Sequence, residues 1–355
     1  FFFFTPQTAT PMLRSLVGSE MCIRDRSNKA QVIHNLGPPN SMKWQDWPLS
    51  YPKVGEVRLR HTAIGVNFAD TYHRAGISHP WPVSKPPVVI GFEGVGIIDE
   101  IGQDVKNFKI GDKVAYGIPP LGSYSEFRNY PADKLLHLPV ELDDKEVASI
   151  LMKGMTAQYL LHRTYKVKKN DTVLIHAAAG GMGLILCQWA KAIGAIVIGT
   201  VSTKAKAEIA KEAGCDYPII RSSENFVKVV KEVTNGKGCD VVYEAIGKDT
   251  LQQSLDSLKP MGMCAAYGHV SGPPDPIDVI QDLGRRGSLF ITRPAIMHYL
   301  ATRDDLEWAA NDLFKAISKG TIKSNVNYEF QLKDAVKAHE AIESGKTEGS
   351  IILLP

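Results

Sequence analysis

Two patterns of hydrophobic and polar residues follow each other along the chain and meet near residue 143. In the first part, short apolar runs are separated by glycine, proline and aspartate. These runs are residues 54–60, 88–90, 94–98 and 113–115. Short runs at this close spacing are typical of strands in a small barrel or sandwich without crossover helices. We therefore predict a β-rich unit that begins at Lys29 and extends to about Pro139.

The second pattern alternates helices with strands. The expected strands are residues 172–176, 195–201, 241–245 and 263–267. The expected helices are residues 144–151, 155–164, 182–193, 205–213, 226–234 and 250–258. Strands that alternate with helices of this length predict an α/β unit built on a doubly wound parallel sheet.

The C-terminal part of the chain resembles neither unit by itself. A helix is expected at residues 305–319, and an amphipathic segment at 332–344 lies between short strand patterns at 327–331 and 350–354. We expect this tail to return and complete the first unit. The predicted domains are residues 29–150 with 325–355 for the β-rich unit, and residues 151–324 for the parallel-sheet unit.

The segment before residue 29 fits neither pattern. Phe1–Phe4 is apolar, but no basic region precedes it as a secretory signal would require. Residues 15–26 show neither strand alternation nor a clear helical stripe. We interpret residues 1–28 as a disordered leader or a sequence-assembly artefact outside the fold. An amphipathic organelle transit peptide is the alternative.

Length and composition narrow the class of protein. A chain of 355 residues is long enough for two domains, and 44% hydrophobic with 22% charged residues is the balance of a water-soluble globular protein. The net charge of +3, with both signs dispersed, gives no reason to expect a nucleic-acid partner. No apolar run approaches the roughly 20 residues that cross a bilayer, so we expect no membrane partner.

The five cysteines form no C-x-x-C pair, and their odd number and scattered spacing do not indicate a disulfide framework. Cys187 and Cys264 lie in apolar segments, where we expect buried, inert thiols. Reduced thiols of this kind favour a cytoplasmic location.

A glycine-rich turn lies between the strand expected at 172–176 and the helix expected at 182–193. In register with G-x-G-x-x-G it has alanine in the first position. The second and third glycines let the backbone approach a pyrophosphate and the helix pack on its strand, while the helix N-terminus offers N–H groups to phosphate. The flanking strand and helix favour dinucleotide binding over a plain tight turn. The expected contacts are Ala178, Gly180, Gly181, Met182 and Gly183.

The end of the next strand indicates which dinucleotide binds. An NAD site usually carries Asp or Glu there, to bind the ribose 2′-hydroxyl. Residues 199–206 read GTVSTKAK and contain no carboxylate. Thr200, Ser202, Thr203 and Lys206 can hold a 2′-phosphate by charge-assisted hydrogen bonds, although each lysine alone is more simply an exposed helix residue. The missing acid favours NADPH as the cofactor.

With these residues in view, the chain resembles the zinc-free, zeta-crystallin-like quinone oxidoreductases of the medium-chain dehydrogenase/reductase superfamily. The resemblance covers about residues 29–355. It is densest at residues 63–76 (AIGVNFADTYHRAG), 151–158 (LMKGMTAQ), 176–192 (HAAAGGMGLILCQWAKA), 287–294 (GSLFITRP) and 349–355. It implies a GroES-like catalytic β-barrel closed by the C-terminal tail, a Rossmann domain that binds the cofactor, and a homodimer.

The resemblance also implies catalysis without a metal. Zinc-dependent relatives carry a cysteine early in the catalytic domain, a histidine in a G-H-E segment and a four-cysteine lobe. The corresponding residues here are 67–70 (NFAD) and 91–93 (GFE), so that Phe92 stands where the histidine would be. The cysteines lack the required spacing, and we assign no metal ligands. The acceptor must then be electrophilic by itself, which favours a small electron-poor quinone or enone.

Three candidate catalytic residues lie in the segment that resembles the family's substrate and nicotinamide contacts: Asn67, Asp70 and Tyr72. Asn67 or Tyr72 can donate a hydrogen bond to the acceptor oxygen, where negative charge grows. Structural roles are the alternative, since Asn67 can shape a turn, Asp70 can cap the next helix and Tyr72 can belong to the core. No general acid is assigned, so solvent can protonate the product.

The remaining cofactor contacts are carried over from the resemblance. They are Lys153 and Thr156 before the Rossmann domain, Tyr267, Gly268 and His269 after the fourth expected strand, and Ile291, Thr292 and Arg293 beside the nicotinamide. The chain departs from its relatives at three positions. Gln158 and Arg221 stand where relatives often have tyrosine, and Gly345 replaces an arginine of some relatives. Arg221 can strengthen binding of the 2′-phosphate.

The sequence is compatible with three functions. The first is NADPH-dependent reduction of quinones by one or two electrons. The second is reduction of the carbon–carbon double bond of an enone or alkenal at the same site. The third is non-enzymatic, because zeta-crystallin relatives are also structural or RNA-binding proteins. The absence of a basic, aromatic-rich patch argues against RNA.

Overall fold

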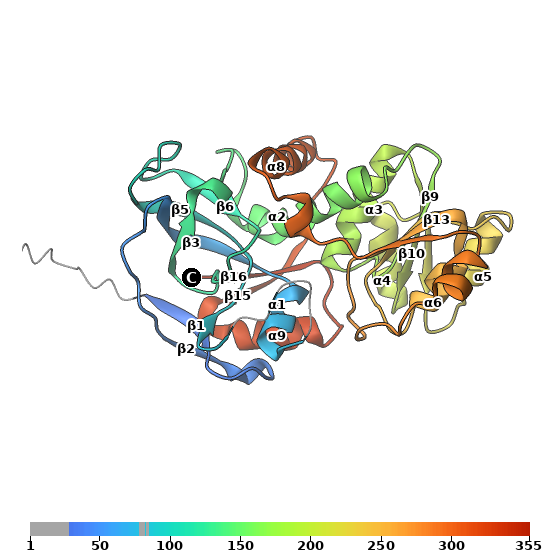
Figure 1. Cartoon of the computed structure of the whole chain (residues 1–355), viewed down its shortest axis with the longest axis horizontal. Helices are drawn as coiled ribbons and strands as arrows, with labels where there is room; N and C mark the ends of the chain where they lie inside the picture. The colour runs from blue at the N-terminus through green and yellow to red at the C-terminus, as the bar shows by residue number, and fades with distance from the viewer. Residues whose placement is uncertain (1–27, 78–81, 83–84) are drawn as a thin grey trace, which may run out of the picture.

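The computed structural model describes residues 28–77, 82 and 85–355. The chain forms a β-rich lobe and a parallel-sheet lobe, joined side by side (Figure 1). In the part of the chain that the structure describes, no helix is both long and apolar enough to cross a membrane. The segment interpreted as a leader lies outside the described residues except for Asn28. That residue packs in the β-rich lobe, where its carbonyl accepts from Trp47 N and its side chain from Phe127 N.

The β-rich lobe is built on a seven-stranded sheet in the order β15-β16-β3-β5-β6-β8, with β7 paired to β3, and on a three-stranded sheet in the order β2-β1-β4. Its first strands are β1 (Lys29–Ile33), β2 (Met42–Asp46), β3 (Glu56–Val66), β4 (Val88–Val89) and β5 (Glu93–Ile101). They are followed by β6 (Lys113–Tyr116), β7 (Phe127–Pro131), β8 (Leu136–His137), β15 (Val326–Gln331) and β16 (Ser350–Leu354). The helices α1 (Phe68–Ala75) and α9 (Ala335–Glu343) lie beside one another below the sheet (Figure 1).

Strand β16 inserts the end of the described chain into the middle of this sheet. It pairs antiparallel with β3, where Ile351 lies opposite Val66, and parallel with β15. The amphipathic segment predicted at 332–344 is a short 3₁₀ turn followed by α9. The side chains of β16 are mostly buried, so that the tail belongs to the core of the β-rich lobe.

The second lobe is a six-stranded parallel sheet in the order β11-β10-β9-β12-β13-β14. Its strands are β9 (Thr172–Ile175), β10 (Ile196–Val201), β11 (Tyr217–Ile220), β12 (Cys239–Glu244), β13 (Leu258–Ala266) and β14 (Phe290–Thr292). Its helices are α3 (Gly181–Ile193), α4 (Lys204–Glu212), α5 (Phe226–Val233) and α6 (Leu251–Asp256). In chain order the strands are arranged 3-2-1-4-5-6, which is the Rossmann arrangement. The predicted α/β class with a doubly wound sheet is confirmed.

One strand of this sheet was missing from the prediction. The segment YPII of β11 is short, contains a proline and begins with an exposed tyrosine, so that it lacks the apolar run of its neighbours. Proline is tolerated there because β11 is an edge strand. Residues 267–269 therefore follow the fifth strand in chain order and not the fourth.

A long helix, α2 (Asp144–Tyr159), joins the lobes and is followed by a π-helical turn at Leu160–Thr164. The Asp143 carboxylate accepts from the amides of Lys145 and Glu146 and caps its N-terminus. The helices predicted at 144–151 and 155–164 are thus one helix. Gly154, between them, gives room to α8 (Arg303–Ser318), because a Cβ there would lie 2.5 Å from Leu313.

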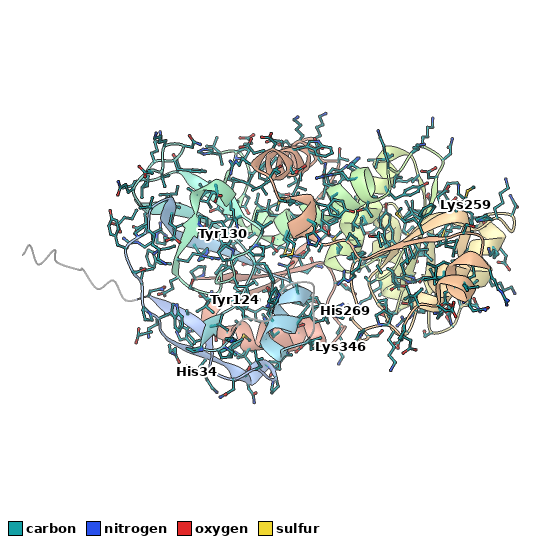
Figure 2. All side chains as sticks on the ribbon, viewed as in Figure 1. His34, Tyr124, Tyr130, Lys259, His269 and Lys346 are labelled. Atoms are coloured by element: carbon teal, nitrogen blue, oxygen red, sulfur yellow. The ribbon has the colours of Figure 1, made fainter. Side chains whose placement is uncertain are left out.

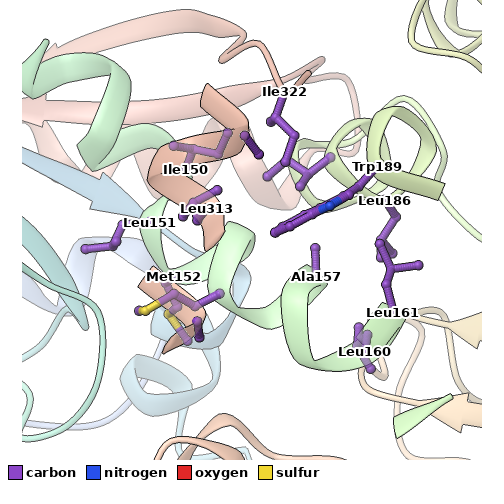
Figure 3. Packing of buried hydrophobic residues seen from close by; sticks show 14 of the residues in the cluster. Ile150, Leu151, Met152, Ala157, Leu160, Leu161, Leu186, Trp189, Leu313 and Ile322 are labelled. Atoms are coloured by element: carbon purple, nitrogen blue, oxygen red, sulfur yellow. The ribbon is translucent and has the colours of Figure 1, made fainter. Parts of the chain in front are cut away.

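The largest apolar cluster surrounds α2. Leu151 and Met152 point toward the β-rich lobe, while Ala157 and Leu161 lie close to Leu186 and Trp189 of α3 (Figure 3). A short helix, α7 (Ile296–Tyr299), also contacts α2. The domain boundary predicted between residues 150 and 151 falls inside α2, so that the two lobes share this cluster.

We expect Ile352→Ala to lower the free energy of unfolding by about 2–4 kcal/mol, because it deletes buried methyl groups from the strand that lies between β15 and β3. Urea denaturation followed by circular dichroism measures this loss. Val140→Ala is the control, since Val140 is 88% exposed and its truncation should change the value by less than about 0.5 kcal/mol. Equal stabilities of the two variants would contradict the placement of β16 in the core.

Candidate functional site

A cavity of about 500 Å³ lies where the two lobes meet. Its walls come from the carboxyl ends of the parallel strands, the N-terminus of α3, the start of α1, one face of α2 and the C-terminal segment 345–351. In an open α/β sheet this end of the strands is where ligands bind. Figure 2 labels His269 and Lys346 in the region between the lobes.

The glycine-rich turn forms the floor of the cavity. Gly180 is the N-cap of α3, and the backbone of Ala177 adopts a positive φ of 52°. A Cβ on Gly183 would lie 2.2 Å from the Ala177 carbonyl oxygen, so only glycine lets the helix approach its strand this closely. A Cβ on Gly181 would lie 3.0 Å from Ser350 Oγ and narrow the space above the turn. The residues present therefore fit a dinucleotide, whose phosphates the turn and the helix N-terminus would hold.

The end of β10 carries no acid, as the sequence indicated. Thr200 and Ser202 line the cavity, and so do Lys206 of α4 and Arg221 after β11. Thr203 does not: its side chain caps α4 by accepting from Lys206 N at 3.2 Å. Lys206 Nζ donates to the Gly345 carbonyl oxygen at 2.7 Å and thereby links the two lobes. Two cations and two hydroxyls at one end of the cavity suit a 2′-phosphate.

Two buried residues that we did not anticipate, His176 and Glu244, lie close together near the glycine-rich turn. His176 Nδ1 lies 2.9 Å from Thr200 Oγ1, and its Nε2 lies 3.4 Å from the Glu244 carboxylate. Burial lowers the pKa of His176, so the ring is held neutral beside Thr200. Glu244 also accepts from the amides of Ile246 and Gly247 and fixes the loop after β12. His176 and Glu244 are far apart in sequence, so no local pattern could link them.

The start of α1 is held by buried polar contacts. Asp70 Oδ2 accepts from Asn67 N at 2.8 Å and from the Tyr124 hydroxyl at 3.0 Å. Burial raises the pKa of Asp70 to about 7. Asp70 is fully buried and does not line the cavity, so the structure gives it the capping role. Its carboxyl contacts the β-rich core, and a direct contact of Asp70 with substrate stays a prediction.

Asn67 and Tyr72 both line the cavity. Asn67 Nδ2 donates to Glu93 Oε1 at 2.7 Å, which fixes the orientation of the amide. Tyr72 stacks on His269 with ring centroids 4.5 Å apart and nearly parallel planes. Burial raises the pKa of Tyr72 to about 12, so its phenol stays protonated at neutral pH and remains a hydrogen-bond donor.

Glu93 holds several elements of the site together. Besides Asn67, it accepts from Met152 N at 2.7 Å and lies 3.3 Å from Lys153 Nζ. Lys153 lines the cavity, and Ser149 O also accepts from its ammonium group. Phe92, beside Glu93, is fully buried. Among the residues that the structure describes, no group of three or more His, Cys, Asp or Glu side chains is placed to hold a metal ion.

The far wall of the cavity follows β13 and β14. Tyr267, Gly268 and Arg293 line it, whereas Ile291 and Thr292 are strand residues of β14 outside it. His269 does not line the cavity either but lies behind Tyr72, with its Nδ1 3.3 Å from Arg293 Nη2. His269 thus contacts two lining residues without facing the ligand space.

The cavity therefore unites most of the predicted residues. The predicted residues in its wall are Asn67, Tyr72, Lys153, Thr156, Gly180, Gly181, Met182, Gly183, Thr200, Ser202, Lys206, Arg221, Tyr267, Gly268 and Arg293. Those outside it are Asp70, Ala178, Thr203, His269, Ile291 and Thr292. Met152 and Tyr159 also line it; they lie four and three residues from Thr156 on one face of α2, a spacing that could have revealed them. No comparable spacing in the sequence indicated that segment 345–351 lines the cavity.

Comparison with known proteins adds two domain families and several relatives. Residues 53–140 match the alcohol dehydrogenase GroES-like domain, and residues 181–313 match the family described as zinc-binding dehydrogenase. A 2-haloacrylate reductase of a Burkholderia species is 54% identical over 92% of this chain and 98% of its own length. A quinone oxidoreductase of Pseudomonas aeruginosa is 42% identical over 90% of this chain and 97% of its own.

A solved structure supports the assignment of the cofactor. The Escherichia coli quinone oxidoreductase in complex with NADPH has a TM-score of 0.89 and 40% identity, and the match covers 93% of this chain and all of that one. That relative binds NADPH, the cofactor that the acid-free end of β10 predicts for the present chain.

We expect Lys206→Ala to raise the KM for NADPH by roughly ten- to a hundredfold and to leave the KM for NADH almost unchanged. One charge-assisted hydrogen bond contributes about 1.5–3 kcal/mol, and only NADPH carries the 2′-phosphate. Initial rates with each cofactor measure the effect. Lys204→Ala is the matched control, because Lys204 is exposed on the same helix and does not line the cavity. Equal changes for NADPH and NADH would refute the assignment of Lys206.

Proposed function

This chain belongs to the quinone oxidoreductases of the medium-chain dehydrogenase/reductase superfamily, and we propose that it uses NADPH to reduce an electron-poor double bond conjugated to a carbonyl group. Quinones, enones and 2-haloacrylates all belong to this class of acceptor. Each accepts a hydride at a carbon atom while negative charge moves to an oxygen. NADPH dependence and oxidoreductase activity are properties of the family, and the acceptor is our proposal.

The observation that carries the proposal is the chemistry of the cavity wall. Its described residues include no aspartate or glutamate, and Asn67, Tyr72 and Lys153 contribute hydrogen-bond donors to it. Bound NADPH supplies the hydride. We infer that the protonated phenol of Tyr72 donates to an acceptor oxygen and that the amide of Asn67, oriented by Glu93, assists from the same cavity wall. Donors fixed in advance stabilise the growing charge without reorganisation.

We propose that no metal takes part in this reaction. Phe92 replaces the histidine of the zinc-dependent relatives, and it packs edge-on against the ring of His73 with centroids 5.2 Å apart. The side chain of Glu93 binds an amide, a backbone N–H and an ammonium group. These contacts use the carboxylate oxygens, so that Glu93 is committed to protein groups.

Two acceptors have specific support. The name of the Pseudomonas aeruginosa relative favours a quinone, the acceptor that the family resemblance implies. The name of the Burkholderia relative, at 54% identity, favours the carbon–carbon double bond of a 2-haloacrylate. This reaction, like the enone or alkenal reduction that the sequence leaves open as the alternative, saturates a carbon–carbon double bond.

We also propose a cytoplasmic location and a homodimer. The four described cysteines are free and buried, as expected for a reducing compartment. Strand β14 is an edge strand, and apolar side chains of Met261, Val279, Ile280 and Phe290 are between 57% and 70% exposed near it or in the segment that leads to it. An exposed apolar sheet edge is suited to pairing with a second copy about a two-fold axis.

Sedimentation velocity at micromolar concentration tests the homodimer. A species of about twice 39.0 kDa is expected for the wild type, and Phe290→Lys should shift the equilibrium toward the monomer because it places like charges at the two-fold contact. Lys259→Ala in the neighbouring strand, on a side chain that is partly exposed, is the control. A wild-type monomer at all concentrations would exclude the dimer.

Oxidation of NADPH, followed at 340 nm with a panel of quinones, enones and 2-haloacrylates, tests the function. We expect turnover with at least one member of the panel, faster with NADPH than with NADH, and unchanged by a chelator. Tyr72→Phe should lower kcat/KM by roughly ten- to a hundredfold, because one donor to the developing negative charge is lost. Tyr51→Phe is the control, since Tyr51 is 55% exposed and lies outside the cavity.

Nucleotide binding without turnover of any acceptor would rule out the proposed reaction. Loss of turnover on chelation would instead refute the metal-free mechanism.

A further inference from the structure

The charged side chains in the described wall of the cavity are all positive. Four cationic residues, Lys153, Lys206, Arg221 and Arg293, belong to its described wall, and no acidic residue does. Their surroundings differ. Lys153 lies beside the buried Glu93 carboxylate, so its charge is offset within the protein. The other three cations are offset by no carboxylate in the wall, and such a concave site attracts anions.

We assign two of these cations to binding of the cofactor. Lys206 follows β10 and Arg221 follows β11, which lie together at one edge of the parallel sheet. The 2′-phosphate of NADPH is the anion that matches this end. Arg293 follows β14 at the opposite edge. Five strand spacings of roughly 4.8 Å place β14 about 24 Å from β11, so one phosphate cannot serve both ends.

The surroundings of Arg293 leave its charge available. Its guanidinium lies 3.3 Å from His269 Nδ1, and its charge acts on the nearby phenols of Tyr72 and Tyr159. No aspartate or glutamate of the described chain lies within the 4.0 Å of a salt bridge to it. The residue is exposed and lines the cavity, so that an incoming ligand can reach it.

The family resemblance implies that Arg293 contacts the cofactor, but the positive charge of Arg293 favours another ligand. Hydride transfer leaves the nicotinamide ring positively charged, and a lone guanidinium beside that ring would oppose the reaction. An anion bound to the guanidinium would remove this repulsion. The ligand that completes this end of the site is therefore expected to carry a negative charge.

Building on the proposed function, we propose that Arg293 binds the carboxylate of the acceptor, and that the acceptor is a small α,β-unsaturated carboxylate. The planar guanidinium can donate two parallel hydrogen bonds to a carboxylate, with Tyr72 beside it. The acceptor takes up the hydride at its β-carbon and a proton from water at its α-carbon. Its double bond becomes a single bond as NADPH is oxidised to NADP⁺, and the added negative charge passes through the carboxylate that Arg293 holds.

The test compares 2-chloroacrylate with its neutral amide, 2-chloroacrylamide, as acceptors. The wild type is expected to have the higher kcat/KM for the carboxylate. In Arg293→Gln the ratio of the two kcat/KM values should fall by ten- to a hundredfold, because only the carboxylate uses the lost charge. Arg293→Lys keeps the charge without the planar pair of donors and should recover part of the ratio.

Arg221→Gln is the matched control at the other end of the cavity. It should raise the KM for NADPH and leave the carboxylate-to-amide ratio as in the wild type. Calorimetric titration of 2-chloropropionate into the NADP⁺-bound protein gives a readout without turnover. At least tenfold weaker binding is expected for Arg293→Gln.

Three results would overturn the role of Arg293. The first is an equal fall in kcat/KM for the carboxylate and the amide in Arg293→Gln. The second is a raised KM for NADPH in that variant. The third is a wild type that reduces only the neutral members of the panel. The last result would leave the proposed reaction standing. Failure of every acceptor with the wild type would instead defeat the proposed reaction, and the calorimetric comparison would then decide whether Arg293 binds a carboxylate.

Discussion

The buried carboxylate of Glu93 is the interaction on which the arrangement of the site depends. It lies on β5 and accepts hydrogen bonds from Asn67 at the start of α1 and from the backbone of α2. Gly65 on β3 makes the contact possible, because a Cβ there would lie 2.3 Å from the carboxylate oxygen and 2.1 Å from the Ala148 carbonyl oxygen. Removing one partner of such a buried group leaves unpaired polar atoms, which destabilises a protein far more than losing an exposed pair does. The sheet of the β-rich lobe, the Asn67 amide in the cavity wall and the helix that joins the lobes are therefore fixed by one side chain.

The features that could be predicted from the sequence are those that depend on residues close together along the chain. The strand–turn–helix from β9 to α3 has an apolar run, a glycine pattern and a helical stripe in about twenty consecutive residues, so that both the fold and the cofactor site followed from it. The end of β10 indicated NADPH for the same reason. The strand β11 was missed because its proline and its exposed tyrosine interrupt the local pattern.

The features that could not be predicted depend on residues that meet only after folding. Glu244 and His176 are separated by 68 positions, and Asp70 meets Tyr124 across 54. The wall formed by segment 345–351 reaches the turn only because β16 returns to the barrel. His269 and Arg293 were both assigned to the cofactor from a resemblance, yet only one of them faces the cavity. Side-chain direction after a strand is set by its tertiary neighbours, here the ring of Tyr72.

The place of β16 between β15 and β3 also sets the order in which the β-rich lobe can be completed during synthesis. Ile351 pairs with Val66, 285 residues earlier, whereas the strands of the Rossmann sheet all lie between residues 172 and 292. The ribosome releases the whole Rossmann lobe before it releases β16. Domains generally fold as units as they emerge, so the sheet of the β-rich lobe can be completed at β3 only after the strands of the Rossmann sheet have been made.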